Sequence, residues 1–215
     1  MLQVLKKIFL PGGKKKRKIL FGLSRGGYMY VDLHHQLRQY FGMYEYQLSK
    51  YFRELISKGD KCYDVGGQGG YDAIMFGNLA KSDILVFECL DEAIEELDEI
   101  ISFNNYNISV IKGFVSDVDE GENITLDKIA EEHFYPDFIK IDIEGGEFNA
   151  LMGSLKIIET KKPKMIIEVH GKDIEEQCID LLKKSGYKIQ IVNQPKLFSE
   201  MRKTFSHNRW LICRP

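Results

Sequence analysis

The sequence predicts an α/β protein whose core is a doubly wound, mostly parallel sheet of about seven strands. The first observation is that short apolar segments alternate with segments of helical periodicity from residue 61 onward. The second is a glycine-rich turn at residues 66–70, between the first such apolar segment and the first helical one. The third is size, because 215 residues with 44% hydrophobic and 29% charged side chains suit one globular α/β domain.

The individual elements follow from this periodicity. Strands are expected at residues 61–65, 84–88, 109–115, 138–143, 165–169, 188–192 and 210–213. Helices are expected at residues 71–79, 91–103, 125–133, 149–159 and 174–185. No helical pattern joins the last two strands, and Pro195 interrupts the segment between them, so an antiparallel edge strand is expected there.

A helical extension is expected before the sheet. Apolar residues recur at helical spacing from Leu33 to Ile56, and Gly42 would divide this stretch into two helices. Residues 1–31 are expected to form a separate basic segment, and residues 32–215 a single domain.

The basic segment contains eight Lys and Arg residues and no acid, which leaves 22 basic and 32 acidic residues in the rest of the chain. One interpretation is a solvated, frayed terminus. The other is a contact in the plane of a membrane surface, through apolar side chains beside the lysines: Leu2, Leu5, Ile8 and Phe9. The acidic charge of the remaining chain argues against nucleic acid as the main partner.

The sequence also bears on localisation. It contains no run of about 18 apolar residues that could span a membrane, and no secretory cleavage site follows its first ten residues. The four cysteines form no CxxC pair and are interpreted as reduced thiols. A cytoplasmic protein is expected, with a peripheral membrane contact of the basic segment as the alternative.

The glycine-rich turn Gly66-Gly67-Gln68-Gly69-Gly70 follows the first strand directly and precedes the first helix. Such a turn lets a ligand approach the backbone, and the helix N-terminus adds N–H donors. A dinucleotide fingerprint would need a glycine at Asp72, and no Walker lysine follows. Asp64, two residues before the turn, suits a cationic ligand. The alternative is a tight turn that binds nothing.

Glu88 ends the second strand, 24 residues after Asp64. A carboxylate in this place can accept hydrogen bonds from both hydroxyls of a ribose. It therefore favours an adenosyl ligand, either S-adenosylmethionine or a nicotinamide dinucleotide. The alternative is an exposed acid at a strand end.

Polar residues also follow the fourth and fifth strands. Lys140, Asp142 and Glu144 alternate with isoleucines, and Glu168 and His170 alternate in the same way on the fifth strand. Ligands of open α/β sheets bind at the carboxyl ends of the strands. If the two strands are neighbours, we expect their acids and His170 to line one crevice. Each of these residues taken alone has a purely structural explanation.

These residues together resemble the FkbM-type family of class I S-adenosylmethionine-dependent methyltransferases. The resemblance spans roughly residues 42 to 213, and its most specific part is residues 137–147. The sequence departs from the family at Gly67-Gln68-Gly69, where Ala-Asn and a larger residue are usual. The other matching segments are Gly42-Met-Tyr-Glu45, Gly59-Asp60, residues 63–71, Phe87-Glu88, Asn104-Asn105, Thr125-Leu-Asp127, Lys162-Pro163 and residues 166–170.

The resemblance implies a Rossmann-like class I methyltransferase fold, S-adenosylmethionine as donor, and O-methylation of a hydroxyl on a sugar, polyketide or similar small metabolite. It further implies that Ser116 or Asp117 flanks the adenine and that Asp142 lies near the methionine end and the acceptor. The cofactor contacts that it implies are Glu45, Asp64, Gly66, Gly67, Gly70 and Glu88.

A hydroxyl is a poor nucleophile while it keeps its proton, so a base or a metal ion must help to remove it. His170, or Asp142 and Glu144, are the candidate bases. Alternatively, Asp142, Glu144 and Glu168 hold a divalent cation. Two other functions stay open: a nicotinamide-dependent oxidoreductase, and a non-catalytic adenosyl-binding protein that acts through its N-terminal segment. The acceptor pocket is expected between the aromatic-rich stretch 28–52 and the loop 194–208.

Overall fold

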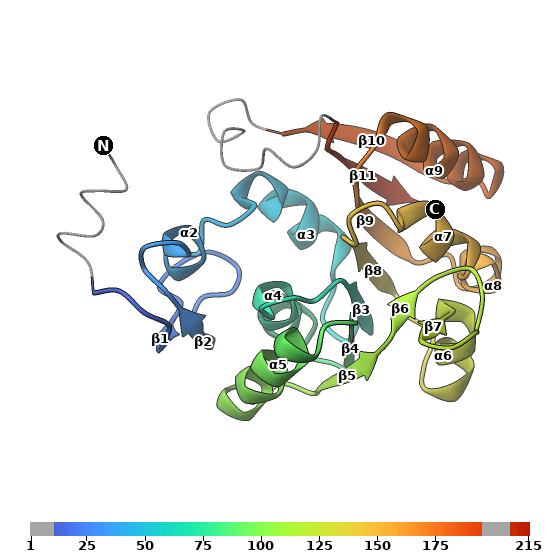
Figure 1. The fold of residues 1–215 in the computed structure, drawn as a ribbon. Coiled ribbons are helices and arrows are strands. Elements are labelled where there is room, and N and C mark those ends of the chain that lie inside the picture. The colour runs from blue at the N-terminus through green and yellow to red at the C-terminus, as the bar shows by residue number, and fades with distance from the viewer. Residues whose placement is uncertain (1–10, 195–206) are drawn as a thin grey trace.

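The computed structural model describes residues 11–194 and 207–215 and contains the predicted sheet (Figure 1). Its seven strands lie in the order β10-β11-β9-β8-β3-β4-β5. All neighbours from β9 to β5 are parallel, whereas β11 is antiparallel to both β9 and β10. The antiparallel strand is therefore second from the edge. The strands are β3 (Cys62–Val65), β4 (Ile84–Glu88), β5 (Ile108–Lys112), β8 (Phe138–Ile141), β9 (Lys164–Val169), β10 (Lys188–Asn193) and β11 (Arg209–Arg214).

Helices cover both faces of the sheet, because alternate strand residues are apolar on both sides. Ile139 and Ile141 pack toward the helices α6 (Leu126–Glu132), α7 (Glu147–Met152), α8 (Leu155–Thr160) and α9 (Lys172–Lys184). Phe138 packs on the opposite face against α3 (Ser49–Leu55) and α4 (Tyr71–Ala80), and α5 (Asp91–Phe103) completes that layer. The doubly wound α/β class predicted from the sequence is confirmed.

Two predicted elements are divided in the structure. The third strand ends at Lys112, and beyond Gly113 the chain continues as β6 (Phe114–Val115), which pairs with β7 (Asn123–Ile124). The helix expected at 149–159 is two helices, α7 and α8, because the chain turns at Gly153. A side chain at Gly153 would collide with the carbonyl oxygen of Ser116.

The N-terminal extension differs most from the prediction. The expected long helices are replaced by α2 (Leu37–Tyr40), the 3-10 turn η1 (Tyr46–Leu48) and α3. Gly42 and Glu45 have positive φ angles of 66° and 46°, which an α-helix cannot contain. Gly42 also packs so closely against the carbonyl group of Phe21 that a side chain would not fit.

Residues 15–31 are folded, so the interpretation as a frayed terminus is wrong for this part. β1 (Lys15–Lys18) and β2 (Tyr28–Val31) form an antiparallel hairpin, and Met29 and Val31 are buried with Ile100 of α5. Lys14 forms an ion pair with Glu96 of α5 at 2.6 Å. The apolar residues of the suggested membrane contact, Leu2 to Phe9, lie outside the described residues. No helix within residues 11–194 and 207–215 is both long and apolar enough to cross a membrane.

Candidate active site

Two adjoining cavities lie at the carboxyl ends of the central strands, and Gly66, Gln68 and Asp142 line both of them. The cavity beside Glu88 has a volume of about 260 Å³, and the cavity toward the N-terminal extension has about 100 Å³. This is the edge of the sheet at which open α/β folds bind their ligands. The predicted location of the site is therefore occupied by cavities that share one wall.

The glycine-rich turn is shaped by the protein itself. Gly66 has φ +92°, and a side chain there would collide with the carbonyl oxygen of Asp142, while one at Gly67 would collide with Val86. The N–H groups of Gly66 and Gly67 both donate to the carbonyl oxygen of Phe87, at 3.0 and 3.1 Å. Packing against neighbouring strands thus already requires these glycines. The polar groups around the turn, in contrast, are not explained by packing and indicate a ligand.

Asp64 is the first of these polar groups. Its side chain is buried, and neither carboxylate oxygen has a hydrogen-bond partner within the described residues. Burial, reinforced by the charge of Asp72 and opposed by Lys140, raises the pKa of Asp64 to about 8. A buried carboxylate without a partner is costly. A ligand that brings a positive charge or N–H donors would relieve this cost.

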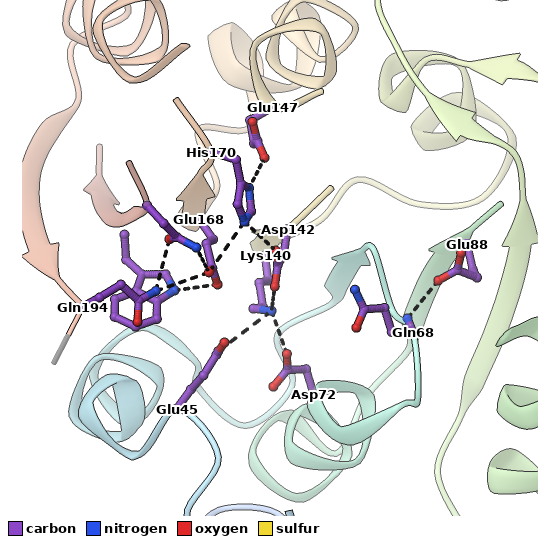
Figure 2. A network of polar contacts seen from close by, with 12 residues as sticks. Glu45, Gln68, Asp72, Glu88, Lys140, Asp142, Glu147, Glu168, His170 and Gln194 are labelled. Atoms are coloured by element: carbon purple, nitrogen blue, oxygen red, sulfur yellow. Dashed lines mark hydrogen bonds and ion pairs between the residues drawn. The ribbon is translucent and has the colours of Figure 1, made fainter. Parts of the chain in front are cut away.

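Lys140 lies at the centre of a buried acidic cluster (Figure 2). Its Nζ atom is 2.7 Å from Oδ2 of Asp72, 3.3 Å from Oδ2 of Asp142 and 4.0 Å from Oε2 of Glu45. Burial disfavours the ammonium ion, but these carboxylates raise the pKa of Lys140 well above its usual range. Burial raises the pKa of Glu45 to about 8. The sequence pattern did not assign a role to Lys140, although a lysine between buried isoleucines was the available signal.

His170 is held between three carboxylates (Figure 2). Its Nδ1 atom is 2.6 Å from Oε1 of Glu147, and its Nε2 atom is 3.7 Å from both Oδ1 of Asp142 and Oε1 of Glu168. Burial opposes the charged ring, but the hydrogen bond with Glu147 and the contact with Glu168 raise the pKa of His170 to about 10. This favours the charged form of the imidazole, which argues against the role of general base that the sequence suggested.

Glu168 is fixed by residues from the end of the described chain. Its Oε2 atom accepts a hydrogen bond from Nε1 of Trp210 at 2.9 Å, and its Oε1 atom accepts one from Nδ2 of Asn208 at 2.7 Å. Gln194 donates to the same Oε1 atom at 3.3 Å. The side chain of Glu168 is fully buried. These bonds hold the carboxylate in one orientation beside His170.

The predicted crevice therefore contains Asp142, Glu168 and His170, but Glu144 is not part of it. The strand β8 ends at Ile141, and Glu144 has φ +48°, so the alternation of the strand does not extend to this residue. Glu144 is exposed and lines the larger cavity instead. Glu147, the first residue of α7, lies beside His170 instead of Glu144.

Glu88 is the last residue of β4 and lies at the wall of the larger cavity. Its Oε2 atom accepts the N–H of Gln68 at 2.9 Å, and its Oε1 atom accepts those of Cys89 and Leu90 at 2.8 and 3.0 Å. Ser116 and Asp117 do not line this cavity. Its apolar walls come from Leu90 and Phe114 among others, and these two side chains are 62% and 48% exposed. Leu90 lies in a loop and carries no periodic signal in the sequence.

The model of the methyltransferase FkbM domain matches residues 77–209. The match begins after the glycine-rich turn and includes β8 and β9. No curated protein sequence matches the chain significantly.

Several solved structures share the fold. The methyltransferase FkbM from Methylobacillus flagellatus has 18% sequence identity and a TM-score of 0.57, over 84% of this chain and 53% of that protein. The present chain thus spans about half of that relative. M. jannaschii TYW2 in complex with AdoMet has 12% identity and a TM-score of 0.58, over 96% and 87% of the two chains. Aeropyrum pernix fibrillarin with natively bound S-adenosyl-L-methionine has 13% identity and a TM-score of 0.53, over 74% and 67%.

Proposed function

The chain belongs to the FkbM methyltransferase family, and on this premise we propose that it transfers a methyl group from S-adenosylmethionine to a hydroxyl group of a small metabolite such as a sugar or a polyketide. The observation that carries the proposal is the excess of acid around Lys140. Its single ammonium group is surrounded by four carboxylates, those of Asp72, Asp142, Glu45 and Asp64. Within the described residues these acidic groups outnumber the ammonium group, so the site suits a ligand with cationic groups better than the pyrophosphate of a dinucleotide.

The residues present fit S-adenosylmethionine. Asp64, which lacks a hydrogen-bond partner among the described residues, suits the ammonium group of the methionine part. Glu88 suits one ribose hydroxyl, because a carboxylate has about four acceptor sites and the backbone uses three of them. Leu90 and Phe114 offer apolar surface to the adenine. When bound, the cofactor supplies the methyl group on a sulfonium sulfur.

The acceptor hydroxyl must lose a proton as the methyl group arrives. Asp142 lines both cavities, so its carboxylate can receive a hydrogen bond from an acceptor in one and face a cofactor in the other. Lys140 and His170 lie on either side of it, at 3.3 and 3.7 Å, and the ammonium group of Lys140 stabilises a negative charge on it. We assign Asp142 the task of orienting the hydroxyl and drawing its proton. Glu144, on the wall of the larger cavity, stays a second candidate.

The smaller cavity is the proposed acceptor pocket. Gln36, Gln39 and Tyr44 of the N-terminal extension line it together with Asp142. Amide and phenol groups can exchange hydrogen bonds with the hydroxyls of a sugar. This supports the expected role of residues 28–52 as a wall. Most of the loop 194–208, expected as the other wall, lies outside the described residues.

The test begins with mass spectrometry of the natively purified protein. S-adenosylmethionine or its demethylated product is expected, and recovery of a dinucleotide would refute the assignment. Transfer of a labelled methyl group to cell extract, followed by fractionation of the product, would then identify the acceptor and show whether oxygen carries the label. A nitrogen- or carbon-bound label would refute O-methylation.

The role of Asp142 is tested with two matched variants. Asp142→Asn should bind the cofactor within a few-fold of the wild type but transfer the methyl group at least about 100-fold more slowly. Asp98→Asn, on the exposed face of α5, should keep the wild-type rate. An Asp142→Asn variant with undiminished transfer would exclude Asp142 as the proton acceptor.

A further inference from the structure

The ring of His170 presents one nitrogen to two carboxylates of the same cluster. Its Nε2 atom is 3.7 Å from Oδ1 of Asp142 and 3.7 Å from Oε1 of Glu168. Both separations exceed the length of a normal hydrogen bond. The three ligand atoms all lie within 4.8 Å of one another. They therefore surround a common point between the ends of β8 and β9.

The two separations of 3.7 Å match those between two ligands of one metal ion. Bonds from a metal to histidine nitrogen and carboxylate oxygen are about 2.0 to 2.2 Å long. Two such ligands are about 3.4 to 3.7 Å apart when they subtend the angles of a tetrahedral or trigonal site, and about 3 Å apart at a right angle. The observed 3.7 Å falls at the upper end of the first range. We propose that Asp142, Glu168 and His170 bind one divalent transition-metal ion, of the class of Zn²⁺ or Mn²⁺.

The contacts around the three residues are those that orient metal ligands. The Nδ1 atom of His170 is engaged at 2.6 Å by Glu147, whose side chain is fully buried, so Nε2 is the nitrogen that faces the other two groups. A histidine ligand typically uses its second nitrogen in this way, to contact a carboxylate. Glu168 is likewise held by Trp210 and Asn208. The orientation is therefore built into the protein before any ion binds.

The donor set indicates the class of ion. One imidazole nitrogen and two carboxylate oxygens suit zinc, manganese or iron, whereas Mg²⁺ and Ca²⁺ prefer oxygen ligands throughout. The proposed ligands differ from those expected from the sequence, because His170 is a ligand in place of the exposed Glu144. Asp142 connects this site to the two cavities, because it lines both.

The consequence for catalysis rests on the proposed function, whereas the binding of the ion does not. An acceptor hydroxyl hydrogen-bonded to Asp142 would lie beside the ion. A metal ion stabilises an oxygen that is losing its proton. The ion and Asp142 would share the activation of the hydroxyl.

The test is a titration of the full, chelator-treated chain with MnCl₂, followed by electron paramagnetic resonance of free Mn²⁺ and by calorimetry. One ion per chain is expected to bind, and ZnCl₂ should displace it. Glu168→Gln should weaken Mn²⁺ binding at least tenfold, and so should His170→Asn. If the change at the buried Glu168 prevents folding, the His170→Asn variant still tests the site. Glu147→Gln should weaken it about 10- to 100-fold through the orientation of His170. Glu144→Gln is the matched control and should bind like the wild type.

Circular dichroism and the melting temperature establish that each variant is folded. Equal Mn²⁺ affinity in the wild type and in folded His170→Asn would overturn the proposed site, as would loss of binding in Glu144→Gln alone. A chain that binds one Mn²⁺ through these residues but methylates no acceptor would support the site and refute the proposed function. Methyl transfer at full rate in excess chelator, with no Mn²⁺ bound, would refute the site alone.

Discussion

Replacement of Asp64 by Asn should stabilise the ligand-free protein and weaken its binding of S-adenosylmethionine. The carboxylate is buried without a hydrogen-bond partner in the described part of the chain, and burial raises its pKa from 3.8 to about 8. The unfolded chain ionises this group near pH 4, so the folded protein holds more protons between pH 4 and 8. By linkage, its stability therefore falls as the pH rises through this window.

The magnitude follows from the same values. Between the ordinary pKa of 3.8 and pH 7 the folded state loses at most about 4 kcal/mol, at about 1.4 kcal/mol per pKa unit. The amide of Asn is also buried and regains only part of this. We expect a net gain of about 1 to 3 kcal/mol, which corresponds to a rise of roughly 2 to 10 °C in melting temperature for a chain of this size. Loss of a charge-assisted bond to the ligand should weaken cofactor binding about 10- to 100-fold.

The assay combines thermal melts of the ligand-free protein from pH 5 to 8 with calorimetric titration of the cofactor. The melting temperatures of the wild type and of Asp64→Asn should diverge as the pH rises, and Asp98→Asn should follow the wild type throughout. A lower melting temperature for Asp64→Asn at pH 7, or an unchanged cofactor affinity, would refute the assignment of Asp64 as a strained group that the cofactor relieves.

Three further outcomes are expected. Glu88→Gln should weaken binding of the cofactor about 10- to 100-fold in calorimetry, and an unchanged affinity would remove Glu88 from the cofactor site. Gly66→Ala should lower the free energy of unfolding by more than about 2 kcal/mol in denaturant, because φ is +92° and the new methyl group would collide with the carbonyl oxygen of Asp142. A denaturant midpoint equal to that of the wild type would contradict this. Asp137 is partly buried, which opposes its ionisation, but the hydrogen bonds from Lys161 and from the N–H of Lys61, together with nearby lysine charges, outweigh burial and lower its pKa. Asp137→Asn should be less stable than the wild type at pH 7 by up to about 1 kcal/mol, and melts from about pH 4 down to 2 should show that difference vanish.

The sheet was predictable because its strands are encoded locally. The isoleucines that alternate with polar residues on β8 face one helical layer, so periodicity alone located this strand. The N-terminal extension was not predictable in the same way. Leu33 to Ile56 keeps helical spacing, but Gly42 and Glu45 adopt left-handed conformations, and Gly42 does so where it packs against Phe21. Such contacts between distant segments leave no periodic signal in the sequence.

The candidate site was predictable only as far as the strands continue. Asp142, Glu168 and His170 meet because β8 and β9 are parallel neighbours, as the alternation implied. The same alternation was wrongly extended to Glu144, since the turn after Ile141 redirects the chain. The partner of His170 is Glu147, which α7 brings back over the strand ends. A helix that folds back in this way depends on the tertiary structure.

The position of β11 has a consequence for how the protein is made. This strand lies inside the sheet, paired on both sides, and its Trp210 donates a hydrogen bond to Glu168, 42 residues earlier in the chain. During synthesis from the N-terminus, β9 must therefore wait with an open edge until β11 is available. Open edges expose a chain to wrong pairing, and long-range pairs form late. The half of the sheet that carries Glu168 is thus the last to close, and substitutions in β11 should reduce the yield of folded protein before they alter its chemistry.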